Sequence, residues 1–268
     1  MNESELVFTQ ILNCSRQDLY LDRDRKLDQE NSTLIFQVFK ERVSGKPIQY
    51  ILGKTEFMGL EFKIIPGVFI PRPETEILVE TAIKVIQSSS HPVTKLKILD
   101  IGTGSGCIAV SLANLLPDME ITATDISPLA LEITKENAKL NDVNINFLES
   151  DLFASPDLRP IAYNLIVSNP PYITTSEIAG LAREVRYQPR IALDGGSDGL
   201  NFYRRIIKDS PAYLEDNGHL ILEMGFTQRK AIEKIAQASG RFSLVRVVRD
   251  YKNIERVVVL KKAGVGHG

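Results

Sequence analysis

The chain of 268 residues is long enough for one large domain or two modest ones, and 43% of its residues are apolar while 25% are charged. No apolar run approaches the roughly 20 residues that a membrane-spanning helix requires, which excludes a membrane span. A formal net charge of −2 makes nucleic-acid binding less expected, because proteins that neutralise many phosphates usually carry a basic excess.

The first 53 residues predict a small helical domain. Between residues 4 and 42, apolar side chains recur at helical spacing on two successive faces, Leu6, Ile11 and Leu12, then Leu34, Ile35, Val38 and Phe39. The stretch Ser44-Gly45-Lys46-Pro47 ends the second helix and allows a short helix to begin at the proline. Residues 55–70 then alternate in polarity between turn signals, which indicates a β-hairpin or an extended linker. We therefore expect a helical domain over residues 1–53 and a linking hairpin over residues 54–73.

From residue 74 to residue 268, strands alternate with helices. We expect helices over residues 74–87, 106–116, 127–140, 203–214 and 228–239, and strands over residues 97–100, 120–124, 144–148, 165–167, 219–222, 244–248 and 256–260. Residues 88–92 should form a loop. This alternation predicts a doubly wound α/β fold, in which helices cover both faces of a parallel sheet. The last two strands are joined by too few residues for a helical crossover, so we expect a terminal antiparallel hairpin with one reversed strand at the end of the sheet.

A glycine-rich loop follows the first strand of this predicted sheet, and its sequence is Gly102-Thr103-Gly104-Ser105-Gly106. Glycines let a backbone pass close to a ligand, and the helix that follows offers unpaired N–H groups. The spacing differs from the G-x-G-x-x-G fingerprint of dinucleotide-binding proteins. The loop therefore suits a sulfonium amino acid better than a pyrophosphate, although a strand-to-helix turn can also carry glycines for purely structural reasons.

Two carboxylates follow the next two strands. Asp125 ends the second strand, where a carboxylate can accept hydrogen bonds from both hydroxyls of a ribose. The alternative role of Asp125 is to cap the helix that begins at Ser127. Asp151 ends the third strand and could accept a hydrogen bond from the exocyclic amine of an adenine, while Leu152 or Phe153 covers the face of the ring.

The fourth strand runs directly into the segment Asn169-Pro170-Pro171-Tyr172. Ligands of open α/β sheets bind outside the carboxyl ends of the strands, so the four strand ends should meet at one crevice that holds both cofactor and substrate. An –NH2 group on a planar carbonyl or ring could donate one hydrogen to the side-chain oxygen of Asn169 and another to the carbonyl of Pro170. Tyr172 could stack on the flat group. The structural alternative, a proline strand terminator, explains neither the asparagine nor the tyrosine.

Thiols and imidazoles indicate neither a disulfide framework nor a metal site. The two cysteines, Cys14 and Cys107, are too few and too far apart for a disulfide framework, and two reduced thiols in the cytoplasm are the simpler account. The three histidines show no metal-ligand spacing. The first five residues are acidic rather than basic, and no uninterrupted apolar stretch follows them, so we expect no secretory signal.

The motifs of this chain resemble those of the release factor glutamine methyltransferases, the PrmC/HemK family, over nearly the whole chain. Besides the glycine loop, the segments that carry the resemblance are Ile70–Glu76, Ile98–Ile101, Val167–Ile173, Tyr187–Pro189 with Ala192-Leu193, and Asp250-Tyr251 with Glu255-Arg256. The resemblance implies that residues 74–268 form a Rossmann-like class I methyltransferase domain that uses S-adenosylmethionine. One departure is that Leu152 stands where many relatives have tryptophan.

The resemblance also implies a reaction. A methyl group would pass from S-adenosylmethionine to the side-chain amide nitrogen (N5) of the glutamine in the Gly-Gly-Gln motif of peptide chain release factors, leaving S-adenosylhomocysteine. The expected cofactor-binding residues are Gly102, Thr103, Gly104, Ser105, Gly106, Asp125, Asp151, Leu152, Phe153 and Asn169. The expected substrate-binding residues are Asn169, Pro170, Pro171 and Tyr172, and the catalytic set is Asn169, Pro170 and Tyr172. The amino-terminal helices would dock the release factor, unless they are only a stabilising extension. We expect a cytoplasmic enzyme with no metal, no membrane partner and no direct contact with nucleic acid.

Two other interpretations share part of this pattern. An adenine-N6 methyltransferase acting on DNA or RNA would share the Asn-Pro-Pro-Tyr chemistry but would have to flip a base out of its stack. A non-catalytic partner protein could bind S-adenosylmethionine without using it, although an intact Asn169 and Tyr172 argue against that. Arg72, Thr75 and Glu223 could border the pocket, and the sequence assigns them no role.

Overall fold

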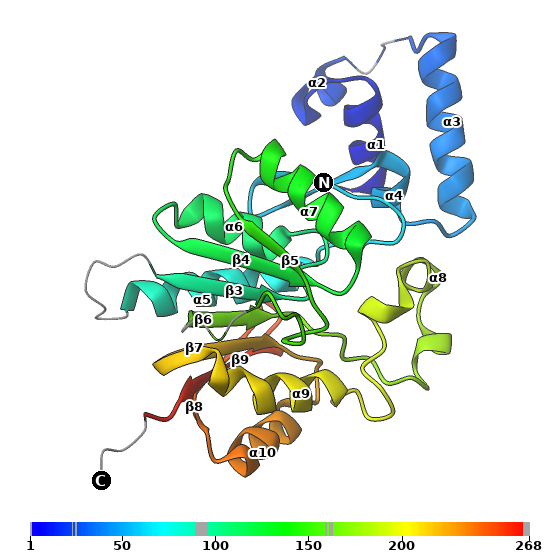
Figure 1. Ribbon diagram of the computed structural model, residues 1–268. Helices are drawn as coiled ribbons and strands as arrows, with labels where there is room; N and C mark the ends of the chain where they lie inside the picture. Colours follow the sequence, from blue (N-terminus) through cyan, green and yellow to red (C-terminus); the bar gives the residue numbers. More distant parts are fainter. Residues whose placement is uncertain are drawn as a thin grey trace.

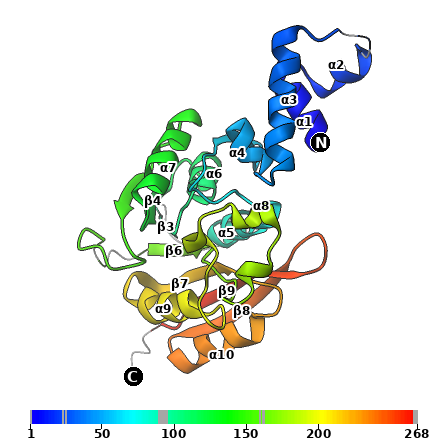
Figure 2. The ribbon, with the colours of Figure 1, turned by 90° about the vertical axis from the view of Figure 1, so that its right-hand side faces the viewer.

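The amino-terminal helices stand apart from the sheet. The computed structural model describes residues 2–22, 24, 26–88, 96–158, 160 and 163–264. Within these ranges the chain begins with α1 (Glu3–Ile11), α2 (Arg16–Leu21), α3 (Gln29–Val43) and α4 (Ile48–Leu52). Figure 2 shows α1, α2 and α3 projecting from one corner of the larger domain. Side-chain caps begin the first three helices, at Asn2, Ser15 and Asp28, and Val7, Ile35 and Ile48 form a small separate core.

Helix α2 is an addition to the helices that the sequence predicted. It has six residues, and none of them is buried, so it lacks the apolar stripe by which helices are recognised in a sequence. Its signal is the capping box, in which the Ser15 side chain accepts a hydrogen bond from the backbone N–H of Asp18 and the Asp18 side chain accepts one from that of Ser15.

The predicted hairpin after α4 is confirmed. Strands β1 (Lys54–Phe57) and β2 (Leu60–Lys63) pair antiparallel. Asn137 fastens this hairpin to the larger domain, because its Oδ1 accepts a hydrogen bond from Lys63 N at 2.7 Å while its Nδ2 donates to Lys63 O at 3.1 Å. A short 3₁₀ turn, Pro73–Thr75, then leads into the sheet domain.

The sheet has seven strands among the described residues, in the order β5-β4-β3-β6-β7-β9-β8. Their bounds are β3 Lys97–Ile101, β4 Glu120–Asp125, β5 Asn146–Glu149, β6 Tyr163–Ser168, β7 Leu214–Glu223, β8 Phe242–Arg249 and β9 Glu255–Lys262. Strands β3 to β7 pair in parallel, as predicted, and β8 with β9 forms the predicted antiparallel hairpin. The reversed strand is β9, and it lies between β7 and β8 rather than at the end of the sheet, because the hairpin folds back and inserts its second arm next to β7.

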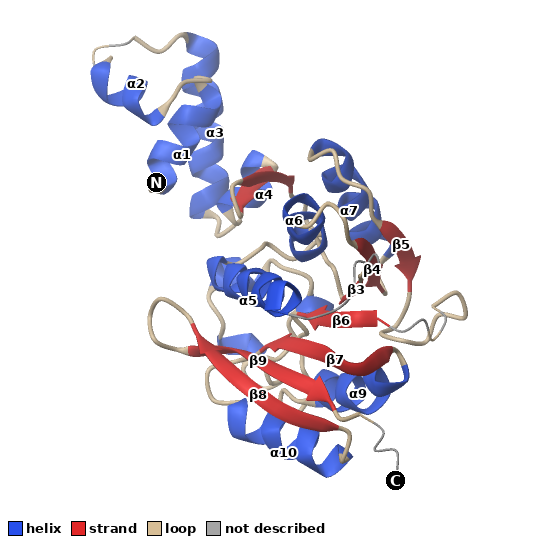
Figure 3. Ribbon diagram, turned by 90° about the vertical axis from the view of Figure 1, so that its left-hand side faces the viewer, coloured by secondary structure: helices blue, strands red, loops and turns tan. Residues whose placement is uncertain are grey.

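Helices cover both faces of this sheet. Figures 1 and 3 show α5 (Glu76–Ser88), α6 (Cys107–Leu115) and α7 (Pro128–Leu140) on one face and α9 (Asn201–Asp209) with α10 (Arg229–Ser239) on the other. Side chains alternate along a strand, so Ile98 packs with α5 and α6 while its neighbour Leu99 packs with α9 and α10. The domain therefore has two hydrophobic cores, one on each face of the same sheet.

One helix predicted in this domain is shorter in the structure, and one predicted loop falls almost wholly outside the described residues. The helix expected over residues 203–214 ends at Asp209, and a 3₁₀ turn over Ser210–Ala212 follows, since Pro211 has no N–H to continue a helix. Leu214 opens β7 instead of ending a helix. The predicted loop over residues 88–92 lies outside the described residues, apart from Ser88.

The segment between β6 and α9 carries only short elements, namely the 3₁₀ turns Ile178–Gly180 and Arg190–Ala192 and the helix α8 (Arg183–Arg186). The ion pair between Arg42 on α3 and Glu184 on α8 joins this segment to the amino-terminal helices. In the part of the chain that the structure describes, no helix has the length and apolar character needed to span a membrane.

Candidate active site

A cavity of about 480 Å³ opens at the carboxyl ends of the parallel strands. It is lined by residues that follow β3, β4, β5 and β6, the four strand ends that the sequence predicts to meet. The predicted site residues in its wall are Gly102, Thr103, Gly104, Ser105, Asp125, Asp151, Leu152, Asn169, Pro170, Pro171 and Tyr172. Two predicted residues, Gly106 and Phe153, are not part of this wall.

The glycine loop combines close approach to the cavity with tight packing behind it. Gly102, Gly104 and Gly106 all have positive φ angles, of 71°, 60° and 81°, a backbone conformation that residues other than glycine rarely adopt. Gly106 faces α7, where an added Cβ would lie 2.6 Å from Cγ2 of Thr134. The sequence predicts Gly106 as a cofactor contact, but the structure places it at the start of α6, where it allows α6 and α7 to approach.

Asp125 ties the glycine loop to the beginning of α7. Its Oδ2 accepts a hydrogen bond from Gly104 N at 2.8 Å, and its Oδ1 accepts one from Ser127 N at 2.9 Å. Burial raises the pKa of this carboxyl, and the backbone hydrogen bonds partly offset that effect. The helix cap itself is the Ser127 hydroxyl, which accepts from Ala130 N. Each carboxylate oxygen can accept a further hydrogen bond, so Asp125 can also hold ribose hydroxyls at the cavity wall.

Apolar side chains face the cavity beside the two carboxylates. Ile126, directly after Asp125, is a wall residue that remains 46% exposed, and the sequence analysis missed it although an apolar residue after an acidic strand end is a usable signal. Leu152 lines the cavity with a φ of 56°, and Ser150 holds this turn by donating from Oγ to Leu152 O. A strained non-glycine residue of this kind costs on the order of 1–3 kcal/mol and is typical of functional sites.

Phe153 and Asp151 take different positions. The Phe153 ring stacks on Tyr213 with the ring centroids 4.6 Å apart, so it supports the domain core and Leu152 is the side chain that can cover a planar ligand. Asp151 lines the cavity and pairs with Arg205 of α9 at 2.8 Å. A ligand amine that binds Asp151 would therefore share the carboxylate with this arginine.

The Asn169–Tyr172 segment is held by backbone packing that only glycines permit. An added Cβ on Gly195 would lie 2.8 Å from Pro171 O, and one on Gly199 would lie 2.4 Å from Tyr172 O. Gln228 donates from Nε2 to Tyr172 O at 2.9 Å. The sequence analysis missed these three positioning residues, because no local pattern indicates which distant segment a glycine will face.

Polar groups on neighbouring elements support this segment from behind. The Asn169 side chain donates from Nδ2 to Thr75 Oγ1 at 3.2 Å. Burial raises the pKa of Tyr172 to about 12, and the negative charge of Glu223 adds to the effect, so the phenol remains neutral at physiological pH. Glu223 is buried, and burial raises the pKa of its carboxyl to about 7.

A second buried carboxyl lies beneath the glycine loop. Asp100 accepts a hydrogen bond on Oδ2 from Thr103 Oγ1 at 2.7 Å, while its Oδ1 is buried with no hydrogen-bond partner among the described residues. Burial raises the pKa of Asp100 to about 7. Over the same described residues, no group of three or more histidine, cysteine, aspartate or glutamate side chains could hold a metal ion.

Comparison with known proteins identifies the family. The sequence matches the Methyltransferase small domain over residues 60–186 and the PrmC N-terminal domain over residues 1–53. It is 41% identical over 264 residues to a release factor glutamine methyltransferase of Fusobacterium nucleatum, covering 97% of this chain and 73% of the relative. It is 38% identical over 265 residues to that of Thermodesulfovibrio yellowstonii, covering 98% and 93%. The chain belongs to the release factor glutamine methyltransferase family.

The fold of this family member is shared with more distant methyltransferases. The N-terminal domain of human METTL16, solved in complex with SAH, superposes with a TM-score of 0.55 at 21% identity over 76% of each chain. At that identity the likeness concerns the fold alone. It supports the class I methyltransferase fold that the sequence motifs predicted.

The wall of the cavity fits the cofactor of such a methyltransferase. Gly102 and Gly104 leave room beside the backbone for a methionine chain. Asp125 offers carboxylate oxygens to a ribose, and the apolar side chains of Ile126 and Leu152 suit a purine ring. Members of this family are S-adenosylmethionine-dependent enzymes, and the cavity holds groups for each part of that molecule.

Proposed function

We propose that this protein transfers a methyl group from S-adenosylmethionine to the side-chain amide nitrogen of a glutamine, and that this glutamine belongs to the Gly-Gly-Gln motif of peptide chain release factors. The single observation that carries the proposal is the position of Asn169. Its Nδ2 donates to Oγ1 of Thr75, another residue of the cavity wall, whereas no described residue donates to its Oδ1. The amide oxygen is therefore available to a substrate –NH2 group in the same cavity as the glycine loop.

The residues of the site would select a reactive geometry for the amide. Bound S-adenosylmethionine supplies an electrophilic methyl group on a sulfonium. Asn169 Oδ1 and the Pro170 carbonyl would accept the two hydrogens of the glutamine –NH2 group, and Tyr172 would pack on its planar amide. Held in this way, the nitrogen turns its lone pair toward the methyl carbon, and orientation supplies much of the rate enhancement.

The bond changes balance without a strong base. The N–C bond would form as the S–C bond of bound S-adenosylmethionine breaks, and the leaving group would be the neutral thioether S-adenosylhomocysteine. The nitrogen becomes cationic only on methylation and then releases its proton to solvent, so Asn169 and Pro170 need not remove a proton. This account agrees with the neutral Tyr172 phenol, which would contribute its ring face rather than a charge.

We further propose the division of labour along the chain. Residues 1–53 would dock the release factor, residues 54–73 would link the two domains, and residues 74–268 would carry the transferase site. The projection of α1 to α3 away from the sheet supports this assignment (Figure 2), as do exposed apolar residues on α3, of which Phe36 is 69% exposed. The alternative acceptor, an adenine in nucleic acid, would share the Asn169 chemistry, and the names of the relatives favour the glutamine.

A labelling experiment tests the proposed function. The enzyme is incubated with radiolabelled S-adenosylmethionine and one of three possible acceptors. These are a release factor, its variant with the motif glutamine changed to alanine, and a mixture of DNA and RNA with no release factor. We expect label only in the unchanged release factor, on the motif glutamine when the site is mapped by mass spectrometry. Label in nucleic acid, or label that survives the glutamine-to-alanine change, would overturn the proposal.

The matched enzyme variant is Asn169→Ala. Loss of a hydrogen bond made chiefly in the transition state should lower kcat about 100-fold. The dissociation constant of S-adenosylmethionine, measured by calorimetry, should change little. Equal losses in turnover and cofactor affinity would show that Asn169 serves the cofactor and not the amide.

A further inference from the structure

A buried carboxyl group lies directly behind the substrate-facing asparagine. Strands β6 and β7 pair in register with Ser168, the last residue of β6, opposite Leu222. The residues that follow these two along the chain, Asn169 and Glu223, are therefore neighbours at the carboxyl edge of the sheet. Glu223 is only 2% exposed, and its Oε2 has no hydrogen-bond partner among the described residues. Burying a carboxyl group without full hydrogen bonding costs stability.

Hydrogen-bond polarity connects Glu223 to the orientation of Asn169. The Thr75 hydroxyl and the Asn169 amide both lower the pKa of the Glu223 carboxyl, which places them close to it as donors although Oε2 itself has no hydrogen-bond partner among the described residues. An ionised carboxylate can only accept hydrogen bonds, so the single hydrogen of the Thr75 hydroxyl is directed to Glu223. The Thr75 oxygen is then left to accept, and the group that donates to it is Asn169 Nδ2, at 3.2 Å.

The consequence for Asn169 follows from its two-ended amide. When Nδ2 is drawn toward Thr75 and Glu223, Oδ1 must point the opposite way. A reversed amide would place Oδ1 against the lone pairs of Thr75 and the carboxylate, and it would offer N–H groups to a substrate that itself has N–H groups to donate. The direction of all the hydrogen bonds from Glu223 through Thr75 to Asn169 is therefore set by the buried carboxylate of Glu223.

The surroundings of Glu223 give its carboxyl a pKa at which the protonated and ionised forms are both populated near neutral pH. Burial raises the pKa of Glu223 to about 7, the Thr75 hydroxyl and then the positive charge of Arg256 lower it, and the Glu74 carboxylate raises it. The other titratable groups that face it are Tyr172, Tyr203 and Cys107, all of which burial keeps neutral. Arg256 is therefore the cation that favours the carboxylate.

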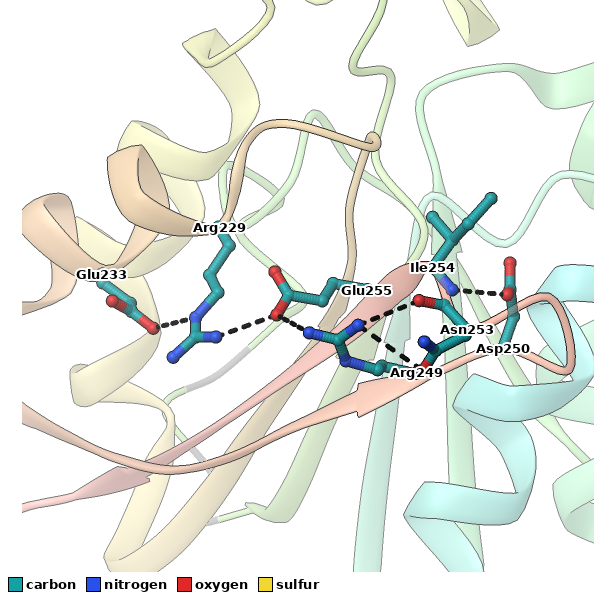
Figure 4. A network of polar contacts seen from close by, with 7 residues as sticks. All are labelled: Arg229, Glu233, Arg249, Asp250, Asn253, Ile254 and Glu255. Carbon is teal, nitrogen blue, oxygen red and sulfur yellow. Dashed lines mark hydrogen bonds and ion pairs between the residues drawn. The ribbon is translucent and has the colours of Figure 1, made fainter.

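The position of Arg256 is itself fixed by the turn between β8 and β9. Its Nε donates to Asp250 Oδ2 at 2.9 Å, and Asp250 Oδ1 also accepts from Ile254 N at 2.9 Å. Figure 4 shows how the same turn is braced by Arg249, which donates to Asn253 O and to the Glu255 carboxylate. These hydrogen bonds keep the Arg256 guanidinium group close to the buried Glu223 carboxyl.

We propose that Glu223 is a positioning residue, which acts through Thr75 to fix the Asn169 side-chain amide with its oxygen toward the substrate nitrogen. This inference rests on the proposed function, since it assumes an acceptor –NH2 group. Glu223 does not touch the substrate or the methyl group. Its effect is transmitted entirely through the direction of the hydrogen bonds.

The test is a double-mutant cycle in the release factor methylation assay, with the variants Glu223→Gln, Asn169→Ala and the two combined. Glutamine has the shape of glutamate but can donate hydrogen bonds as well as accept them. The substitution therefore no longer fixes the direction of the hydrogen bonds through Thr75 to Asn169. We expect Glu223→Gln to lower kcat about 10- to 100-fold while the dissociation constant of S-adenosylmethionine changes less than about twofold. In the Asn169→Ala background the same substitution should cost no further turnover, because its target is gone.

Two additional measurements separate positioning from a structural role. Thr75→Val removes the hydroxyl at nearly constant volume and should resemble Glu223→Gln, whereas Thr75→Ser keeps the hydroxyl and should rescue turnover relative to valine. The acid limb of the kcat profile, expected near pH 7 in the unchanged enzyme, should disappear in Glu223→Gln. A matched control is Glu61→Gln, a surface ion-pair residue of β2, which should leave the profile intact.

The outcomes distinguish the two proposals. If the unchanged protein methylates the release factor but Glu223→Gln turns over at the same rate, or if its loss multiplies with that of Asn169→Ala, the positioning role is wrong and the proposed function stands. If Glu223→Gln fails to fold, the Thr75 pair decides in the same way. If the unchanged protein does not methylate the release factor, the proposed function fails and this inference fails with it.

Discussion

The glycine loop allows a quantitative test of which glycine packs the fold and which makes room for a ligand. Gly106 has a φ of 81°, and an added Cβ would lie 2.6 Å from Cγ2 and 3.2 Å from Cα of Thr134. Thr134 cannot turn away freely, because it is buried and its hydroxyl donates to Gly104 O. Gly106→Ala should therefore cost about 1–2 kcal/mol for the left-handed backbone and about 1–3 kcal/mol for overpacking.

The sum of these costs, about 2–5 kcal/mol, has a measurable scale. At roughly 2–4 °C per kcal/mol for a domain of this size, scanning calorimetry should show Tm lowered by about 4–20 °C. The matched control is Gly53→Ala at the end of α4, where φ is 77° and an added Cβ would meet nothing within 4 Å. It should incur only the backbone cost, about 1–2 kcal/mol.

The counterpart at the cavity is Gly102→Ala. Its φ is 71° and its Cβ would also meet nothing within 4 Å, so its Tm should match that of Gly53→Ala. Because Gly102 lines the cavity, its affinity for S-adenosylmethionine should nevertheless fall, as measured by calorimetric titration. The roles assigned to Gly106 and Gly102 are wrong if Gly106→Ala is no less stable than Gly53→Ala, or if Gly102→Ala binds the cofactor normally.

Three further predictions concern the cofactor, the docking helices and pH. Asp125→Asn should weaken S-adenosylmethionine binding about 10-fold in calorimetric titration, through loss of a charged acceptor; unchanged affinity would remove Asp125 from the ribose site. Phe36→Asp should raise KM for the release factor about fivefold or more without changing cofactor affinity, whereas Leu140→Asp, exposed on α7, should not; equal effects would contradict docking on α3. Asp100 keeps its proton in the folded state up to about pH 7 but releases it near pH 4 when unfolded, so stability falls as pH rises between these values. In urea unfolding, Asp100→Asn should make the free energy of unfolding depend less steeply on pH. Part of the dependence should remain, because burial also raises the pKa of Glu223. A dependence as steep as in the unchanged protein would contradict the effect of burial on Asp100.

Much of the architecture followed from local patterns in the sequence. The alternation of strands and helices after residue 74 predicted the doubly wound sheet, and the short connection at Asp250–Asn253 predicted the hairpin of β8 and β9. These predictions succeed because hydrophobic period and connection length are read over adjacent residues. Where the local signal was weak, as in α2 with no buried residue, the prediction missed the element.

The cavity was predictable for a related reason. In a parallel sheet the carboxyl ends of all strands meet at one edge, so Asp125, Asp151 and Asn169 could be brought together from their order in the sequence alone. Within that frame, position along the loop did not decide which side chain faces the ligand. Leu152 lines the cavity while the next residue, Phe153, stacks on Tyr213, because the left-handed backbone at Leu152 redirects the turn.

The sheet, the order of its strand ends and the chemical groups that they carry could all be predicted from the sequence, because each of these depends on residues that are near one another in the chain. The folded structure was needed to show that Gly106 packs against Thr134, that Gly195 and Gly199 leave space for the Asn169–Tyr172 backbone, and that Glu223 and Thr75 lie close to Asn169. These relations join segments 20 to 150 residues apart, and they depend on shape and hydrogen-bond direction, which no local pattern in a sequence records.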